Sequence, residues 1–224
     1  MLPRIILAAW LLLPVSARAQ DYLLLSLSLE PSFCALSPRN AQRPECARLT
    51  TENFRTTPLT LHGLWPNRAG LSVNRQPQFC DGPRLHRLPA DIQQGLDHFM
   101  PGGRGLVAHE WRRHGTCSGM QPQEYFAAML HLVTTLEPVF APTLSARLGH
   151  SISLAQLQQA ASEPALAQSL ILYCRTPYGG GPALASELRF TLSPDLKPIL
   201  AASVGLGQNS GCPGGAGLLP APGQ

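Results

Sequence analysis

Apolar positions along the chain follow two periodicities, and the first of them marks strands. Residues 22–29 (YLLLSLSL) begin as a solid apolar run and then alternate with serine, which predicts a buried strand. Residues 59–65 also alternate, and they stop at Pro66, which predicts a strand that ends in a turn. Shorter apolar runs at 170–174 and 188–192 predict two further strands.

The second periodicity, with apolar residues three and four positions apart, marks helices. It predicts a helix that begins at Pro122 and continues over 123–136. Segments at 90–99, 105–115 and 154–161 are also typical of helices. Because helices and strands do not alternate regularly, the pattern favours an α+β fold over a doubly wound sheet.

Segments rich in breakers and polar residues set the predicted boundaries. Residues 31–57 and 67–89 are expected to be loops. The tail 211–224 is rich in Gly and Pro, and it is expected to be disordered. The sequence therefore predicts one domain over 20–210, a length that suits a single core.

Residues 1–19 have the pattern of a secretory signal peptide. Arg4 supplies a positive start, an apolar run follows over 5–15, and Ala17-Arg18-Ala19 fits the cleavage rule, so cleavage is expected after Ala19. A retained anchor is the alternative, but the run is shorter than the roughly 20 apolar residues that span a bilayer. No later stretch is expected to be apolar enough to span a membrane.

Charge alone does not identify a partner. Removing Arg4 and Arg18 lowers the number of basic residues from 17 to 15 against 13 acidic ones, which leaves a net charge of +2. This excess is too small to indicate nucleic-acid binding by itself. Any affinity for a polyanion must therefore come from local placement of charge.

Six cysteines follow the signal segment, and their even number predicts three disulfides formed in an oxidising compartment. Six cysteines allow 15 pairings, and the sequence does not choose among them. The pairing without nesting joins Cys34 to Cys46, Cys80 to Cys117 and Cys174 to Cys212. A zinc cluster is the alternative, but no two cysteines have the C-x-x-C spacing.

The segment 109–117 (HEWRRHGTC) gathers chemically active side chains on the predicted helix. Because each residue of an α-helix turns the chain by about 100°, four of them share an arc of roughly 140°: His109, Glu110, Arg113 and His114. The carboxylate is expected to raise the pKa of His114, and the guanidinium to oppose that.

Two alternatives compete for this helix. A zinc peptidase needs H-E-x-x-H, with histidines four positions apart, whereas His109 and His114 are five apart and their rings diverge. The other alternative is a helix whose charges only satisfy one another. So many reactive groups, close to two aromatic side chains, favour a catalytic role over this one.

A second reactive segment, His62-Gly63-Leu64-Trp65-Pro66, lies at the end of a predicted strand. Gly63 allows another backbone or a ligand to approach closely. Trp65 taken alone is more often a core residue than a stacking platform. Two histidines with ordinary pKa values near 6.5 can hold opposite roles as acid and base at mildly acidic pH.

Cleavage of RNA fits these groups. It needs a base for the 2′-OH proton, an acid for the leaving 5′-oxygen, and a cation with donors for the charge of the transition state. Arg113 and His109 suit the last need, and an aromatic ring can stack on a base. No metal or other cofactor is expected, because the nucleophile belongs to the substrate.

At these residues the sequence resembles the ribonuclease T2 family of secreted acid ribonucleases. The family signatures are close to F-T/L-x-H-G-L-W-P and K-H-E-W-x-K-H-G-T-C. Here they stand as LTLHGLWP at 59–66 and AHEWRRHGTC at 108–117. The likeness covers most of the mature chain, but strong identity is confined to the two signatures.

The resemblance implies an α+β fold around a central antiparallel sheet flanked by helices. It implies an endoribonuclease that forms a 2′,3′-cyclic phosphate, with hydrolysis to a 3′-phosphate afterwards. His62 would be the acid and His114 the base, His109 would bind the phosphate, and Glu110 would act with Arg113 on the transition state.

The resemblance also implies that Trp65 and Asn67 line a base pocket, and it supports the Cys80–Cys117 pairing. The expected partner is RNA, the expected state is a monomer, and the expected location is the periplasm or the medium. The alternative within the family is an inactive RNA-binding or storage protein. Such a protein should lack one of the paired histidines, and both are present.

The chain departs from the family pattern at three positions. Arg113 stands where the family usually has Lys, which keeps the charge but changes a point ammonium into a planar fork. Ala108 replaces a common cation, which is expected to weaken phosphate affinity slightly. Leu29 stands where many members have Trp, which is expected to alter packing or a second base pocket.

Overall fold

The computed structural model describes residues 20–223, and its centre is a mostly antiparallel sheet. The order of the main strands is β2-β1-β5-β4-β6. Their bounds are Thr60–Asn67 for β2, Tyr22–Ser28 for β1, Leu184–Leu192 for β5, Leu170–Arg175 for β4 and Asn209–Ser210 for β6. Adjacent strands run antiparallel except for β4 and the short β6. The predicted signal peptide lies outside the described residues.

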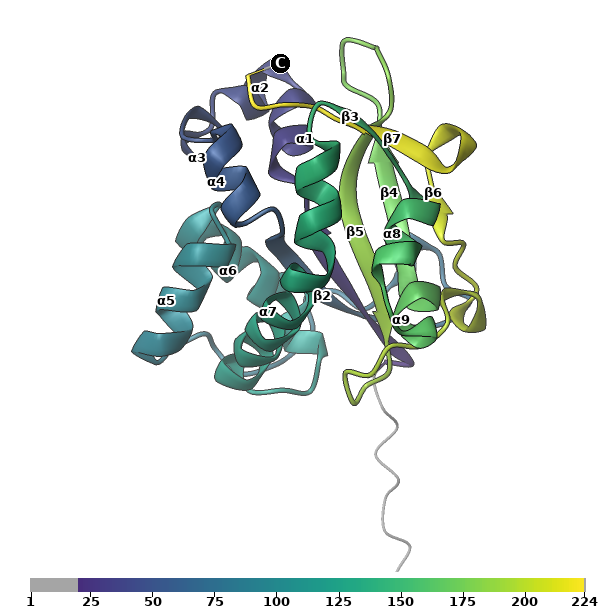
Figure 1. Ribbon diagram of the computed structural model, residues 1–224. Helices are drawn as coiled ribbons and strands as arrows, with labels where there is room; N and C mark the ends of the chain where they lie inside the picture. The colour runs from purple at the N-terminus through teal and green to yellow at the C-terminus, as the bar shows by residue number, and fades with distance from the viewer. Residues whose placement is uncertain (1–19, 224) are drawn as a thin grey trace, which may run out of the picture.

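The C-terminal tail is part of the sheet, so the expected disorder of 211–224 was wrong for the residues described. Strand β7 (Ala216–Leu219) pairs antiparallel with β3 (His150–Ser153) and meets β5 at Leu184 (Figure 1). Leu219 is fully buried. A Cβ at Gly217 would lie 2.7 Å from the Ala185 backbone nitrogen. Glycine at this position therefore lets β7 pack closely against β5. The Gly-rich composition of the tail had instead suggested disorder.

Helices cover one face of the sheet and build the main core (Figure 1). Three lie between β2 and β3: α5 (Ala90–Phe99), α6 (Gly103–Arg113) and α7 (Pro122–Arg147). Two follow β3: α8 (Leu154–Ala160) and α9 (Pro164–Ser169). The α+β fold with helices flanking a sheet is thereby confirmed.

The opposite face of the sheet carries a smaller apolar cluster, and the part of this face next to the cluster is accessible from outside. Tyr22, Leu24, Ile171 and Ala201 form this cluster, and the partly buried Trp65 packs against it. The face therefore leaves room for polar side chains of β2, β4 and β5 next to the cluster.

The stretch 31–57, expected to be a loop, contains most of four short helices. They are α1 (Glu30–Ala35), α2 (Pro38–Ala41), α3 (Pro44–Ala47) and α4 (Thr51–Thr56). Proline occupies the first turn of the first three, where its missing N–H costs nothing. The prolines therefore start these helices, and the expectation of a loop, which rested on proline as a breaker, was wrong here.

Two predicted elements run further than expected. Strand β2 continues through Pro66, which pairs with Leu23. Because β2 lies at the edge of the sheet, the missing N–H of the proline is tolerated there. Helix α7 continues past Pro138 and Pro142 to Arg147. Burial of apolar side chains after each proline, Phe140 after Pro138 and Leu144 after Pro142, accompanies that extension. The remaining short segments are 3₁₀ turns at Val73–Arg75, Gly115–Cys117, Ala201–Val204 and Pro213–Gly215.

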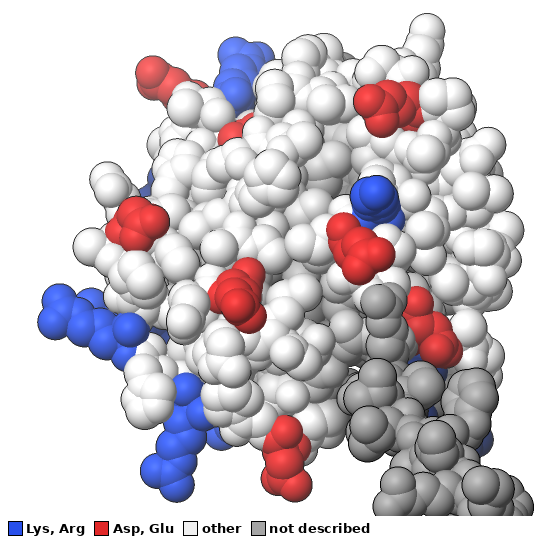
Figure 2. Space-filling model, turned by 90° about the horizontal axis from the view of Figure 1, so that it is seen from below, with Lys and Arg blue, Asp and Glu red and all other residues white. Residues whose placement is uncertain are grey.

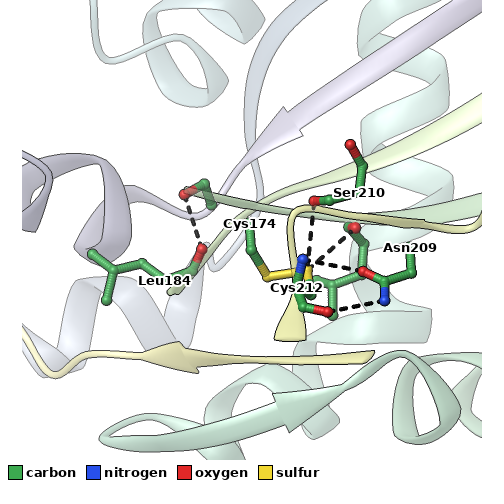
Figure 3. The surroundings of a disulfide bond; sticks show 7 residues. Cys174, Leu184, Asn209, Ser210 and Cys212 are labelled. Carbon is green, nitrogen blue, oxygen red and sulfur yellow. Dashed lines mark hydrogen bonds between the residues drawn. A yellow bond between two sulfur atoms is a disulfide. The ribbon is translucent and has the colours of Figure 1, made fainter. Parts of the chain in front are cut away.

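Three disulfides link the chain as the pairing without nesting predicted: Cys34–Cys46, Cys80–Cys117 and Cys174–Cys212. The last one ties β4 to the segment before β7 (Figure 3). Around it, the Asn209 side chain donates to the Cys212 carbonyl at 2.9 Å and accepts from the Cys212 N–H at 3.1 Å. The tail is therefore held by covalent and polar contacts as well as by strand pairing.

Within the described residues, α7 alone reaches the length and apolarity of a membrane-spanning helix, with a mean hydropathy of 1.2. The expectation that no later stretch would reach this threshold was wrong. Tyr125, Phe126, Met129, Val133 and Phe140 of this helix are fully buried. Burial of these side chains in the main core is typical of a core helix that packs against a sheet.

Candidate active site

The tertiary structure brings the two reactive segments into one cavity of about 520 Å³. His62 comes from β2, and His114 follows directly after α6. The Trp65 ring lies between them, with its centroid 5.1 Å from that of His62 and 5.4 Å from that of His114. All seven predicted site residues line this cavity: His62, Trp65, Asn67, His109, Glu110, Arg113 and His114.

Close packing of β2 on α6 creates this arrangement. A Cβ at Gly63 would lie 2.1 Å from Glu110 Oε2 and 2.3 Å from Trp65 Nε1, so only glycine fits. Trp65 Nε1 donates a hydrogen bond of 2.9 Å to Glu110 Oε2. The Tyr125 hydroxyl of α7 donates to the Leu64 carbonyl at 2.8 Å and fixes the same strand from the core side. Strand, helix and core are therefore joined at the site.

Glu110 is almost fully buried, with 1% of its surface exposed. Burial raises its pKa, and the charges of His62 and Arg113 and the bond from Trp65 oppose that rise. His109 Nε2 lies 4.0 Å from Glu110 Oε1. The carboxylate therefore links the strand side of the site to the helix side.

His114 lies outside the helix, with φ −122° and ψ −48°, and this corrects the expected helical face. Its backbone N–H still donates to the Glu110 carbonyl at 2.9 Å. Burial lowers the pKa of His114 to about 3, and the charges of Arg113, His109 and His62 act in the same direction. The expected rise caused by Glu110 was wrong, because burial and these three charges, and not the Glu110 carboxylate, determine the pKa of His114.

The other catalytic candidate, His62, has a partner from a distant strand that was not predicted from the sequence. Its Nδ1 lies 3.0 Å from Glu187 Oε1 on β5. Burial disfavours the charged ring, but the bond and charge of Glu187, together with the charge of Glu110, raise the pKa of His62 above its usual value. Arg189 opposes that rise.

Glu187 and Arg189 form an ion pair on the same face of β5. Arg189 Nε and one of its terminal nitrogens both lie 2.6 Å from Glu187 Oε2. The pKa of Glu187 is about 2, because the bond to His62 and the Arg189 charge outweigh the effect of burial. The strand was predicted to begin at residue 188, which left Glu187 outside it. Residues two positions apart lie on the same face of a strand, so the opposite charges of Glu187 and Arg189 were the signal that could have revealed this ion pair.

Arg113 and His109 supply positive or polar groups on the opposite side. Arg113 Nε donates to Gln78 Oε1 at 3.0 Å, and its guanidinium lies 5.9 Å from the Phe79 ring centroid. Burial and the charges of Arg113 and Arg112 lower the pKa of His109. The loop before α5 therefore tethers the cation, since the Cys80–Cys117 disulfide joins the loop to the end of α6.

Asn67 lies beside Trp65 at the end of β2. It is 7% exposed, and its amide donates to the Trp65 carbonyl at 3.0 Å.

A second cavity of about 530 Å³ shares His62, His109 and Glu110 with the first. Among residues 20–223, no three His, Cys, Asp or Glu side chains are grouped as metal ligands would be.

Charge is thinly spread on the face of the molecule shown in Figure 2, where acidic side chains lie among wide uncharged areas. The cavity itself is lined by two cations, Arg113 and Arg189, and by one carboxylate, Glu110. Cations are therefore placed at the site although the net charge of the chain is small.

Comparison with known proteins decides the family. Residues 20–200 match the family model of the ribonuclease T2 family. The chain belongs to the ribonuclease T2 family. This range includes both signature segments, both candidate histidines and Glu187.

Individual relatives of the family agree with this placement. A Haemophilus influenzae protein named "Probable ribonuclease" is 34% identical over 120 residues, which are 52% of this chain and 43% of that protein. Ribonuclease I of Escherichia coli is 26% identical over 205 residues, 78% of this chain and 76% of the relative. This chain thus spans less than half the length of the Haemophilus protein.

Solved structures show the same fold. A mutant of RNase MC1 crystallised with 5′-GMP superposes with a TM-score of 0.68 at 18% identity, covering 89% of this chain and 99% of that one. The α+β architecture of the ribonuclease T2 family therefore extends over nearly the whole described chain.

Proposed function

We propose that this protein is an endoribonuclease that cleaves single-stranded RNA without a metal ion, through a 2′,3′-cyclic phosphate. The observation that carries the proposal is the pair of histidines in one cavity whose pKa values are displaced in opposite directions. Two titratable groups made unequal by their surroundings suit the roles of acid and base. Membership of the ribonuclease T2 family supports the same reaction.

The direction of each pKa shift assigns the roles. His114, neutral above a pKa of about 3, accepts the proton of the 2′-OH. The 2′-oxygen then attacks phosphorus, the bond from phosphorus to the 5′-oxygen breaks, and protonated His62 supplies the proton to that oxygen. In the second step, water takes the place of the departed 5′-hydroxyl and the roles are reversed. His62 accepts the proton of the water, the water oxygen attacks phosphorus, the bond from phosphorus to the 2′-oxygen breaks, and His114 returns a proton to that oxygen, which leaves a 3′-phosphate.

The transition state carries additional negative charge on the phosphoryl oxygens. Arg113 and His109, which line the cavity, are the groups we assign to bind them. Glu110 holds the Trp65 ring and lies near His109, so we assign it to order both. The Arg113 fork uses Nε for Gln78, which a lysine in this position could not reproduce.

We place a nucleobase beside Trp65 and Asn67, which line the same cavity. An aromatic ring stacks on an unpaired base with a gain of about 1–3 kcal/mol. The RNase MC1 structure with 5′-GMP supports binding of a nucleotide by this fold. The expected substrate is therefore single-stranded RNA, whose bases are free to stack.

One assay tests the function. Purified protein is incubated with RNA at pH 5–7, with and without EDTA, beside His62→Ala and His114→Ala; exposed His131→Ala on α7 is the matched control. We expect cyclic phosphate ends, no effect of EDTA, and a loss of about 10²–10⁴-fold in each of the two mutants but not in the control.

Two outcomes contradict the proposal. Complete inhibition by EDTA would indicate metal-dependent chemistry. RNA binding by folded wild-type protein without any cleavage would favour the alternative, an inactive RNA-binding or storage protein.

We further propose secretion to the periplasm or the medium after cleavage behind Ala19. The pattern of residues 1–19 and the three disulfides support it. N-terminal sequencing of the protein from its native host is expected to begin at Gln20; a chain that still begins at Met1 would contradict cleavage.

A further inference from the structure

The Glu187 carboxylate is engaged on both oxygens. Oε1 faces His62 Nδ1 at 3.0 Å, and Oε2 accepts from the Ser26 hydroxyl at 2.8 Å and from Arg189 at 2.6 Å. The side chain of Glu187 is 10% exposed. The carboxylate is therefore fixed from three sides, and its free orientation is lost.

Aromatic rings hold the cation that fixes the carboxylate. The Arg189 guanidinium lies 3.7 Å from the Tyr173 ring centroid and 5.2 Å from that of Trp65. A guanidinium stacked in this way is oriented as well as charged. The ordered series therefore runs from Tyr173 through Arg189 and Glu187 to His62.

We propose that Glu187 is a positioning residue that holds His62 in one tautomer and orientation for its role as proton donor. The inference rests on the proposed function, in which His62 is the acid. A carboxylate on Nδ1 keeps the proton at that nitrogen and leaves Nε2 for exchange with the reacting oxygen. The Trp65 ring, at 84° to the imidazole, packs against it and restricts its rotation.

The charges around His62 favour its protonated form. Glu187 and Arg189 face it from β5, and Glu110 faces it from α6. The positive form of His62 in turn lowers the pKa values of His109 and His114. Two carboxylates against one guanidinium thus keep the donor charged while its partner stays neutral.

An ion pair that only stabilises the sheet is the competing explanation. Glu187 and Arg189 alone would satisfy each other, and that role needs nothing from His62. The two explanations differ in the protonation of His62, so the test measures it directly.

The first measurement uses ¹⁵N NMR of the wild-type protein and needs no activity. We expect the pKa of His62 to lie above 6.5, and the neutral ring at high pH to carry its proton on Nδ1. A pKa below 6.5, or a proton on Nε2, would overturn the proposal. This measurement is independent of RNA cleavage. A protein without activity would therefore contradict the proposed function and leave the pKa and tautomer of His62 as a separate test of Glu187.

The second measurement compares two variants whose effects should be opposite. Glu187→Gln keeps the size of the side chain and removes its charge, so the pKa of His62 should fall and the alkaline limb of kcat/KM should move to lower pH. Arg189→Gln removes the opposing charge, so that limb should move to higher pH. We expect kcat of Glu187→Gln to fall at least about 10-fold with KM nearly unchanged.

A matched control separates positioning from packing. Ser26→Ala removes a neutral donor from the other carboxylate oxygen and leaves the Glu187 charge in place, so the limb should move much less than in Glu187→Gln. A folded Glu187→Gln protein with unchanged kcat and an unchanged limb would show that the pair is structural only. If that variant fails to fold, the wild-type tautomer and the shift in Arg189→Gln still decide the question.

Discussion

Two histidines of one cavity differ because their immediate neighbours differ. Burial and three positive neighbours keep His114 neutral, whereas Glu187 and Glu110 outweigh burial at His62 and favour its charged form. At the scale of single residues, the proposed acid and base roles therefore rest on which charges lie beside each ring. The composition of the chain contains no trace of this difference.

A substitution at Arg113 tests this residue-scale view. After burial, the Arg113 charge is the largest cause of the low pKa of His114. Arg113→Gln should therefore raise that pKa, so the acid limb of kcat/KM, on which His114 must lose its proton, moves to higher pH. Turnover should also fall by about 10²–10³-fold, since a cation is lost from the transition state.

The control for this prediction is Arg112→Gln on the same helix. Arg112 is exposed and does not contribute to the pKa of His114, so the limb should not move. Equal pH profiles for the Arg113 variant and wild type would disprove the electrostatic explanation.

At the scale of elements, the site depends on how closely strand β2 approaches helix α6. Gly63 is the contact point, and the bond between Trp65 and Glu110 crosses it. The strand delivers His62 and the helix delivers His109 and Glu110, so their spacing decides whether the groups meet. A glycine in a strand usually weakens it, and here it permits the contact.

Gly63→Ala is expected to separate these two elements. The added methyl group would overlap the Glu110 carboxylate and the Trp65 ring, so one of them must move. We expect a loss of activity of at least about 10²-fold and a loss of about 1–3 kcal/mol in the free energy of unfolding. Cleavage assays and urea unfolding measure the two effects.

The same substitution at Gly179 is the control, because a Cβ there has no neighbour within 4 Å. Gly179→Ala should leave both quantities close to wild type. A Gly63→Ala enzyme with full activity would mean that the close approach is not needed for function.

At the scale of the whole molecule, the two faces of the sheet have separate tasks. One face carries the helices and the main core, and the other leaves the site cavity open beside a small apolar cluster. Strand β7 closes the sheet at the end of the chain, with Leu219 buried and Gly217 packed against β5. The C-terminal segment therefore belongs to the folding unit.

Leu219→Ala tests the role of this strand. Because Leu219 is fully buried, its truncation should cost about 2–5 kcal/mol in the free energy of unfolding. The adjacent Leu218 is only partly buried, and Leu218→Ala should cost less than half as much. Urea unfolding followed by circular dichroism measures both, and equal small losses would contradict the placement of β7 in the sheet.

The sequence by itself determined the local features. Apolar periodicity located β1, α5 and the start of α7, because such patterns need only neighbours along the chain. The two signature segments were recognised from their reactive side chains, and the resemblance to the family joined them and supplied the seven predicted site residues. Three disulfides were expected from the number of cysteines alone.

Only the tertiary structure decided the contacts between distant segments. It placed Glu187 against His62 across 125 positions of sequence, put His114 outside the helix that carries Glu110, and added a Gly-rich tail to the sheet. Each of these depends on burial or on a charge supplied by another element, and no local pattern encodes either. The chemistry of the site was therefore written in the sequence, whereas the protonation of its two histidines comes from the fold.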